Sequence, residues 1–438
     1  RYPIKMECAK SVELPKPEDA PDDYTPQYET VTEVETINSM IPIWKRRKSE
    51  VSEEEYNEFY KSDFHDYANP LRTISIHAEG TLSYDALLFI PGRAPYDLYS
   101  KDYKKGLELY SSNVLIMEKC EDLLPDHYNF VRGVVDSQDL TLNISRETLQ
   151  QNNQLHAIAR KVEKKVTSEL KKMLKNDRAA YEKFFEDFGR GLEYGIYTSY
   201  GMLKDELADL LLFYSAKEQK MVTLAEYLEA MPADQKSIYY AAGDSIDRLA
   251  KLPIVNTVLG KGYDVLLCTK DVDEFCFQAM MTYGPEAEQD AEGKDIEGTG
   301  PKELKNVASG DLDFASEEEK KEAEETEKDN EALLAAMKEQ LGDAVTKVAV
   351  STRLTDAPSA VTTEGPVSLE MERLMSQMPD GMGEVKSQRV LELNAKHPVF
   401  QVLKDAQSAG DAEKAAGRAA ADEPDVLDCG KYAGMTAL

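Results

Sequence analysis

A strand that leads through a polar loop into a long helix is the feature of this chain that most constrains its fold. Residues 130–135 are rich in β-branched and aromatic side chains, and the sequence DSQD that follows is typical of turns. Ser145 can cap a helix, and apolar residues then recur every four positions at Ile158, Val162, Val166, Leu170 and Leu174. The pattern predicts a layered α/β unit whose core includes this stripe.

The first turn of that helix would contain Arg146. A cation there faces the positive end of the helix dipole, at a cost of about 0.3 to 1 kcal/mol. An anion bound at the same end of the helix would explain an arginine at this position. Gln150 lies four residues after Arg146 and would therefore share its face of the helix. The alternative is a surface arginine that pairs with Glu147 or Asp139. Spacing alone leaves both interpretations open.

Alternating apolar patterns predict further strands around this loop. A turn at Glu79-Gly80 joins two of them into a hairpin, and Ser52 with Glu55 forms a capping box for a helix over residues 53–60. The expected strands lie near residues 2–6, 28–37, 73–77, 82–90, 107–110 and 114–117. Together with the helices that follow, they predict a large α/β domain over residues 1–198.

A smaller α/β unit is expected over residues 199–310. Strands at Ile238–Ala242 and Tyr263–Cys268 are separated by about 20 residues of helical pattern, which is long enough for parallel pairing. A helix over residues 205–214 should precede them. The GRGLEYG run that begins at Gly189 fails the spacing of phosphate-binding loops, and it is interpreted as a helix end.

Residues 311–438 predict a third domain of mixed α/β type, behind a hinge rich in Gly, Pro and acidic residues. A highly charged helix opens near Ser316 and should end at Gly342, and strands are expected at residues 345–351 and 360–362. From about residue 410 the tail offers few aliphatic anchors, and it contains four glycines and one proline.

Two apolar features are each open to two interpretations. A short helix between Pro366 and Pro379 crowds together Leu369, Met371, Leu374, Met375 and Met378. Such a stripe usually belongs to a core, yet methionines also adapt to varied partners. Trp44, the only tryptophan, lies beside four consecutive basic residues, which leaves both a core position and an exposed role open.

Charge and residue spacing exclude several classes of function. The formal net charge is −30, with 52 Lys and Arg against 82 Asp and Glu, which argues against binding to nucleic acid or anionic membranes. No apolar run approaches the roughly 20 residues that span a bilayer, and no leader is visible, so the cytoplasm is expected. The five cysteines are scattered and should be reduced thiols, while the five histidines show neither metal-ligand nor triad spacing.

Three long motifs, in collinear order, resemble the middle domain of the ninety-kilodalton heat-shock chaperones in their bacterial form. They are PIWKRRKSEVSEEEYNEFYK, ALLFIPGRAPYDLYS and VRGVVDSQDLTLNISRETLQQN. The similarity extends from about Tyr2 to Ala406. It implies an ATP-dependent chaperone of the stress response that binds unfolded proteins and assists protein folding as a homodimer. In that family the arginine of the SRE triplet contacts the ATP γ-phosphate and a glutamine one turn on supports it, which assigns these roles to Arg146 and Gln150.

The resemblance also implies where non-native client proteins bind. The corresponding positions are Trp44, Glu274, Phe275, Gln278, Leu374, Met375 and Met378. Phe275 departs from the pattern, because some bacterial members have tryptophan there.

Cofactor and partners follow from the same resemblance. ATP with Mg²⁺ would be held by a domain that precedes Arg1, so this chain alone should not hydrolyse ATP. The seventy-kilodalton heat-shock chaperone is an expected partner. Dimerisation should be weak or absent, because the tail lacks the Leu-rich helices of relatives. The alternative to a chaperone is an acidic structural scaffold with no client or nucleotide role, and a free-standing hydrolase has the least support.

Overall fold

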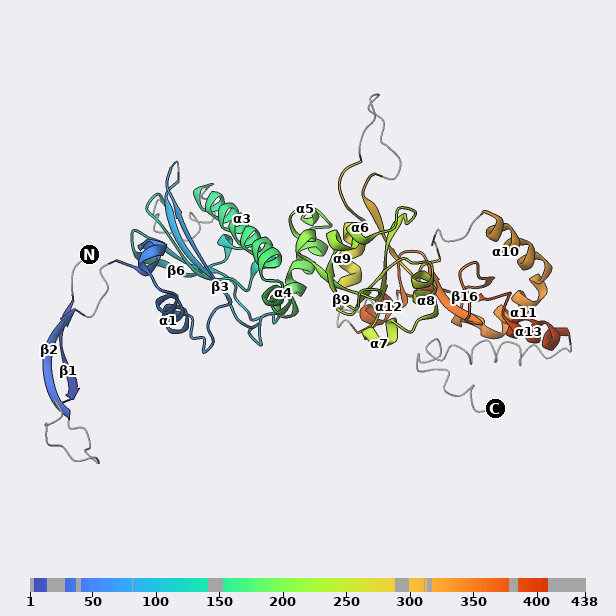
Figure 1. The fold of residues 1–438 in the computed structure, drawn as a ribbon, viewed down its shortest axis with the longest axis horizontal. Helices are drawn as coiled ribbons and strands as arrows, with labels where there is room; N and C mark the ends of the chain where they lie inside the picture. The colour runs from blue at the N-terminus through green and yellow to red at the C-terminus, as the bar shows by residue number, and fades with distance from the viewer. Residues whose placement is uncertain are drawn as a thin grey trace, which may run out of the picture. The chain divides into compact units, whose positions relative to one another are not determined.

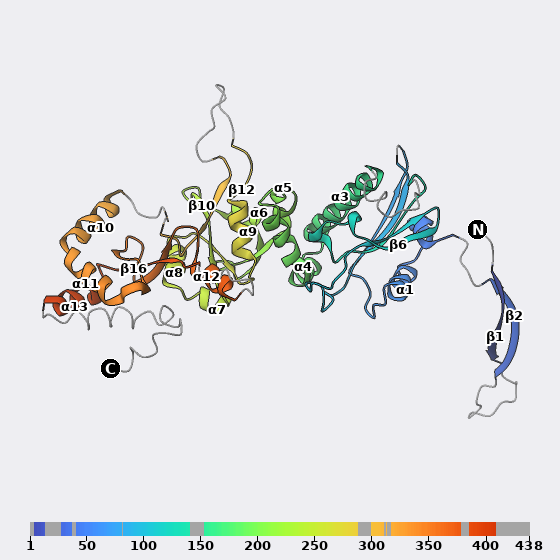
Figure 2. The ribbon, with the colours of Figure 1, turned by 180° about the vertical axis from the view of Figure 1, so that it is seen from behind.

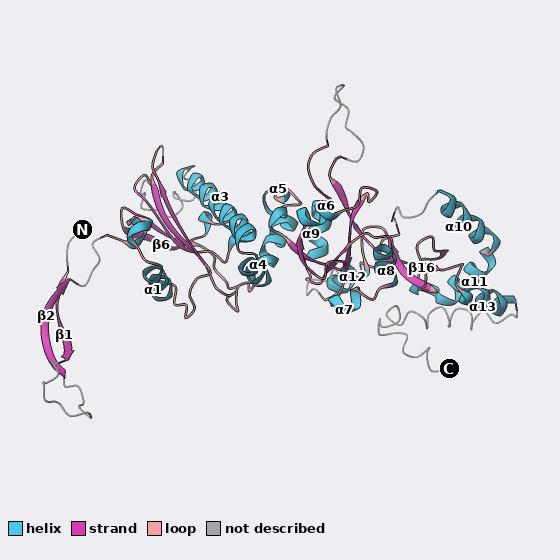
Figure 3. Cartoon of the chain, in the orientation of Figure 1, coloured by secondary structure: helices cyan, strands magenta, loops and turns pink. Residues whose placement is uncertain are grey.

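The computed structural model describes residues 4–13, 28–36, 41–80, 82–140, 153–287, 299–310, 312, 317–377 and 385–408. The chain divides into two compact units, Arg1–Glu169 and Leu170–Leu438. Each contains both helices and strands, which confirms the α/β fold class (Figure 3).

A five-stranded mixed sheet forms the first unit (Figure 1). Its strands, in the order β3-β4-β7-β5-β6, are β3 (Arg72–Ala78), β4 (Tyr84–Ile90), β7 (Arg132–Ser137), β5 (Leu107–Ser111) and β6 (Val114–Cys120). β4 is antiparallel to both β3 and β7, whereas β5 and β7 are parallel. The predicted hairpin over residues 73–90 and the strand near residue 130 are therefore confirmed.

Helix α1 (Glu53–Asp63) covers one face of this sheet. It begins at the predicted capping box, in which the side chains of Ser52 and Glu55 each accept a hydrogen bond from the other residue's backbone N–H. Tyr56 and Tyr60 are buried and pack in a cluster with Leu87, Phe89 and Val134 from β4 and β7. The aromatic face of α1 thus fixes the helix on the sheet.

Two further elements of the first part of the chain match the sequence pattern. β1 (Lys5–Glu13) and β2 (Tyr28–Thr36) pair as an antiparallel ribbon, as predicted. The long helix is α3 (Asn153–Asn176), and its stripe is buried at Ile158, Val162, Val166 and Leu170, while Leu174 is half-buried. The stripe is core, as expected.

The second unit contains a six-stranded sheet in the order β12-β13-β10-β11-β8-β9. The strands are β8 (Leu212–Ser215), β9 (Lys220–Thr223), β10 (Ser237–Ala242), β11 (Val265–Cys268), β12 (Thr282–Tyr283) and β13 (Lys302–Asn306). Its helices are α4 (Arg178–Thr198), α5 (Lys204–Leu207), α6 (Leu224–Ala230), α7 (Ile246–Leu249), α8 (Pro253–Gly260) and α9 (Asp273–Met280). β10 and β11 are parallel and are joined through α7 and α8, which confirms the predicted crossover.

Two predicted helix ends in this unit are wrong. The GRGLEYG run does not end a helix, because α4 continues through it to Thr198. Gly189 is instead a packing residue, since a Cβ there would lie 2.8 Å from the ring of Phe185. The predicted helix over residues 205–214 stops early, and Leu212–Ser215 forms β8 between β9 and β11 because its backbone completes the sheet there.

A three-stranded sheet, in the order β14-β16-β15, organises the rest of the second unit. The elements are α10 (Glu317–Asp329), α11 (Glu331–Leu341), β14 (Lys347–Val350), β15 (Ser359–Glu364), α12 (Leu369–Ser376), β16 (Gln388–Leu393) and α13 (Pro398–Ser408). α11 and α13 share a core with β14 and β16, and Figure 2 shows these helices beside the sheet from behind. The predicted strands are confirmed, while the domain boundaries at residues 198 and 310 stay predictions.

Candidate functional site

The predicted site residues fall into three groups. Arg146, Gln150 and Met378 lie outside the described residues. Trp44 belongs to the first unit. The others lie on α9 and α12 in the second unit, and these two helices meet.

Trp44 lies in a short 3-10 helix (η1, Ile43–Lys45), and its core interpretation is confirmed. The side chain is 8% exposed, and its ring centroid lies 4.9 Å from that of Tyr110. Its Nε1 donates a hydrogen bond of 3.2 Å to Oδ2 of buried Asp136, which also pairs with Lys45 at 2.9 Å. A client contact by Trp44 would require this packing to open, and that role stays a prediction.

Two α9 residues form the base of the junction between α9 and α12. Glu274 is buried, and its carboxylate oxygens accept hydrogen bonds from Asn306 Nδ2 at 2.6 Å and from Ser368 Oγ at 2.5 Å. Burial raises the pKa of Glu274, and these two hydrogen bonds oppose the rise. Phe275 is also buried, with its ring 5.4 Å from that of Tyr197. Glu274 therefore links α9 to the start of α12, whereas Phe275 packs against Tyr197 of α4.

Gln278 joins α9 directly to α12. Its side chain is exposed, and Nε2 donates to the carbonyl oxygen of Pro366 at 2.8 Å. The same nitrogen lies 2.9 Å from the sulfur of Met371, which is buried. The contact makes α9 and α12 neighbours, and each of these two helices carries residues predicted to contact clients.

The α12 helix presents its apolar residues at this junction. Ser368 caps the helix by accepting a hydrogen bond from the backbone N–H of Met371 at 3.1 Å, while also donating to Glu274. Leu374 and Met375 are half-buried, so part of each side chain faces solvent. We call the surface formed by Gln278, Leu374 and Met375 the α9–α12 surface.

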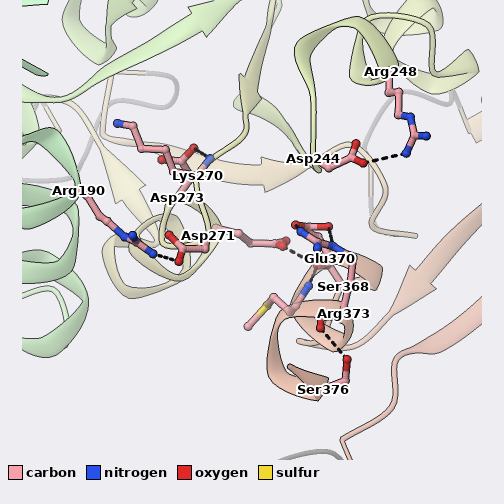
Figure 4. A network of polar contacts seen from close by, with 12 residues as sticks. Arg190, Asp244, Arg248, Lys270, Asp271, Asp273, Ser368, Glu370, Arg373 and Ser376 are labelled. Carbon is pink, nitrogen blue, oxygen red and sulfur yellow. Dashed lines mark hydrogen bonds and ion pairs between the residues drawn. The ribbon is translucent and has the colours of Figure 1, made fainter. Parts of the chain in front are cut away.

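Figure 4 shows polar contacts near the start of α9 and along α12. Arg190 of α4 forms an ion pair with Asp271, which lies just before α9. Within α12, Arg373 pairs with Glu370, and Asp244 attracts the guanidinium of Arg373 from the loop after β10. Such exposed pairs fix geometry more than they stabilise the fold.

A buried charged cluster lies behind α9, and the sequence analysis missed it. Glu193 of α4 is fully buried, and its Oε1 lies 2.8 Å from Nζ of Lys270, whose ammonium is also 3.9 Å from the ring centroid of Phe185. Asp273, at the start of α9, is buried beside Glu193 and accepts a hydrogen bond from the backbone N–H of Lys270 at 2.9 Å. One carboxylate oxygen each of Glu193 and Asp273 has no hydrogen-bond partner among the described residues.

The carboxyl groups of Glu193 and Asp273 are both buried, which disfavours ionisation of both at once. Burial and the charge of Asp273 together raise the pKa of Glu193 to about 8, against the opposing effect of Lys270. The pKa of Asp273 is raised by burial as well. We infer that near neutral pH the pair shares one proton, with Lys270 balancing the remaining negative charge.

Replacing Glu193 with glutamine should make stability less dependent on pH. Between the ordinary carboxyl pKa of 4.5 and about 8, folded Glu193 holds a proton that the unfolded chain has lost, so the free energy of unfolding falls as pH rises. In Glu193→Gln, the fall in the free energy of unfolding with rising pH should become less steep by up to about 1.4 kcal/mol per pH unit. Urea unfolding between pH 5 and 8 measures it, and exposed Glu186→Gln on the same helix is the control. An unchanged slope in Glu193→Gln would contradict the shared proton.

Other kinds of site find little support in the described structure. No group of three or more His, Cys, Asp or Glu side chains among these residues is placed to hold a metal ion. No helix in the described part of the chain combines the length and apolarity that a bilayer crossing needs. The α9–α12 surface is therefore the feature on which a functional proposal rests.

Comparisons with known proteins agree with the motifs. Residues 5–421 match the Hsp90 protein family. Proteins called "Chaperone protein HtpG" from Clostridium perfringens, Oceanobacillus iheyensis and Bacillus subtilis are 49%, 47% and 46% identical over 406, 411 and 406 residues. The alignments cover 93–94% of this chain but only 61–62% of these relatives, so the chain spans about three fifths of their length. On this evidence, the chain belongs to the Hsp90 protein family.

Proposed function

We propose that this chain is the client-binding portion of an ATP-dependent chaperone, and that non-native protein segments bind at the α9–α12 surface. The observation that carries the proposal is the contact of Gln278 with Pro366 and Met371. It joins α9 to α12, the two helices of the second unit whose residues the family resemblance assigns to clients.

The chemistry of this surface suits varied, partly unfolded partners. Met375 and Leu374 offer apolar side chains that remain partly accessible, and methionine adapts to ligands of different shape. The chain around them is strongly acidic, with a net charge of −30. Non-native proteins expose apolar and basic segments, so apolar contact with acidic surroundings favours binding to them.

The nucleotide part of the proposal rests on Arg146 and Gln150. Arg146 would contact the γ-phosphate of an ATP–Mg²⁺ complex held by another domain, and Gln150 would support it from the next helical turn. An arginine placed there stabilises charge that develops on the transferring phosphoryl group. The motif that contains both residues supports this role.

Assembly and location are also part of the proposal. We expect a cytoplasmic chaperone that cooperates with the seventy-kilodalton heat-shock chaperone, and a homodimer that is weak in this chain. The tail from about residue 410, on which the dimer prediction rests, lies outside the described residues. Sedimentation equilibrium at low micromolar concentration measures the association, and a mass of two chains would contradict weak dimerisation.

Charge placed on the α9–α12 surface should weaken client binding. Leu374→Glu and Met375→Glu should each raise the Kd for a fluorescent, permanently unfolded protein about tenfold or more, because each removes 1.5 to 3 kcal/mol of apolar contact, roughly, and adds a charge. Fluorescence anisotropy measures the affinity. Val402→Glu on α13 is the matched control, since Val402 is an exposed aliphatic side chain in the same unit.

The same experiment separates the chaperone from the scaffold alternative. A chaperone should suppress aggregation of a denatured test protein, and the two α12 variants should lose that effect while Val402→Glu retains it. A passive acidic scaffold would give no suppression in any form. Equal losses in all three variants would show that apolar surface in general, and not the α9–α12 surface, binds the client.

A further inference from the structure

Three polar side chains on the first sheet form a hydrogen-bonded chain that the sequence analysis did not expect. Ser75 Oγ lies 3.3 Å from Nε2 of His77, and His77 Nδ1 lies 2.9 Å from Oδ1 of Asp85. Ser75 and His77 are two residues apart on β3, and Asp85 is directly opposite His77 on β4. Side chains two apart on a strand, and those of directly opposed residues, point to the same face of a sheet.

One tautomer of His77 fits both contacts. An ionised carboxylate can only accept, so Nδ1 of His77 carries the hydrogen that faces Asp85. Nε2 then presents a lone pair to Ser75, whose hydroxyl donates to it. A hydroxyl beside an imidazole that is oriented by a carboxylate is the arrangement of a serine nucleophile with its general base. The three partners come from two strands, so their spacing along the sequence does not indicate the arrangement.

The hydroxyl of Tyr56 is a fourth polar group, and it lies near Ser75. Leu87 and Phe89, which share this face of the sheet, pack against α1, and Tyr56 of α1 lies beside Ser75. Tyr56 is 6% exposed, and its hydroxyl has no hydrogen-bond partner of normal geometry among the described residues. Burial raises the pKa of Tyr56 while its interaction with Ser75 opposes the rise. A phenol that keeps its proton next to a nucleophile can donate to an oxyanion formed there.

Solvent reaches the same place. The side chains of His77 and Asp85 are 38% and 30% exposed, whereas Ser75 is half-buried at the border of α1. The partly exposed side chains of His77 and Asp85 leave this place open to solvent, which suits a small, reactive substrate.

We propose that Ser75 is the nucleophile of an acyl-transfer site that accepts acyl groups from small activated esters, independently of client binding. Ser75 Oγ attacks the acyl carbon while its proton passes to His77 Nε2, and Tyr56 donates to the carbonyl oxygen. The ester bond then breaks, and the leaving alkoxide takes the proton from His77. Water repeats the sequence on the acyl-serine, giving a carboxylic acid and restoring the proton to Ser75.

The test uses the full chain with 4-nitrophenyl acetate as the probe. Nitrophenolate release gives the rate, and mass spectrometry of proteolytic peptides locates the acetyl group. We expect acetylation of Ser75 in the wild type and none at this position in Ser75→Ala. His77→Gln should lower the acetylation rate by about 10²-fold, since a positioned general base contributes that much. Tyr56→Phe should lower it by up to roughly 10²-fold, as for a lost oxyanion donor.

Ser100→Ala provides the matched control, because Ser100 is exposed in the same unit but has no histidine partner among the contacts described for it. Its rate and acetylation pattern should equal those of the wild type. Unchanged unfolding curves in urea show that each variant folds. Acetylation that spreads over surface lysines without favouring Ser75, or a Ser75 rate that is the same in His77→Gln, would overturn the proposal.

Discussion

Replacing Arg146 with alanine should lower ATP hydrolysis by roughly 10³-fold when a nucleotide-binding domain of the family is supplied. The guanidinium would stabilise charge on the transferring phosphoryl group, and alanine leaves that charge without a partner. Gln150→Ala should have a smaller effect, about tenfold, since the amide supports the arginine and does not replace its charge. Steady-state phosphate release at saturating ATP–Mg²⁺ measures both.

Arg160→Ala is the matched control for Arg146→Ala. Arg160 is an exposed arginine of α3, later in the chain, so its loss removes an equal charge without touching the SRE motif. Its hydrolysis rate should stay within about twofold of the wild type. A rate in Arg146→Ala equal to that in Arg160→Ala would show that Arg146 has no catalytic role.

Replacing Arg353 with alanine should lower the free energy of unfolding by about 3 to 5 kcal/mol, because it leaves a buried charge unpaired. Arg353 is 4% exposed, and its Nε donates to Glu392 Oε2 at 3.3 Å, with a second guanidinium nitrogen on the other carboxylate oxygen. Glu392 is 8% exposed and also accepts from Ser351 at 2.7 Å and Thr362 at 3.0 Å. Glu392 of β16 is thus hydrogen-bonded to Ser351, just after β14, and to Thr362 within β15.

Urea unfolding followed by circular dichroism measures this cost. Arg373→Ala is the control, because Arg373 pairs with Glu370 on the surface of α12 and should cost less than about 1 kcal/mol. The double variant Arg353→Met with Glu392→Gln should recover part of the loss, since it removes both charges together. If Arg353→Ala were no more destabilising than Arg373→Ala, the buried pair would not hold this sheet together.

Local patterns predicted those parts of the fold that depend on neighbours in the sequence. The capping box at Ser52 and the stripe of α3 follow from helix geometry, so both were correct. β8 was missed because its strand identity depends on pairing with β9 and β11, which the apolar run Leu210–Phe213 does not reveal. The helix end predicted at Gly189 was wrong for a similar reason. This glycine leaves space for the ring of Phe185, and that packing is not visible in the local sequence.

The family resemblance supplied the residues of the candidate site, and their assembly was not predictable from the sequence. The family resemblance named residues on α9 and α12 separately, and only the structure brings Gln278 to Met371. The shared-proton pair joins Glu193 and Asp273 across two elements, so no local spacing shows it. One signal was present, because Glu193 lies four and eight positions after the buried residues Gly189 and Phe185, on the buried face of α4.

Site-specific photocrosslinking tests the central claim, that clients bind at the α9–α12 surface, most directly. A photoreactive amino acid placed at Leu374 should crosslink to an unfolded client protein, and the same group at Val402 on α13 should crosslink far less. An excess of unlabelled client should compete the crosslinks at Leu374 away. Equal crosslinking at the two positions, or none at Leu374 while the client remains bound, would contradict the account.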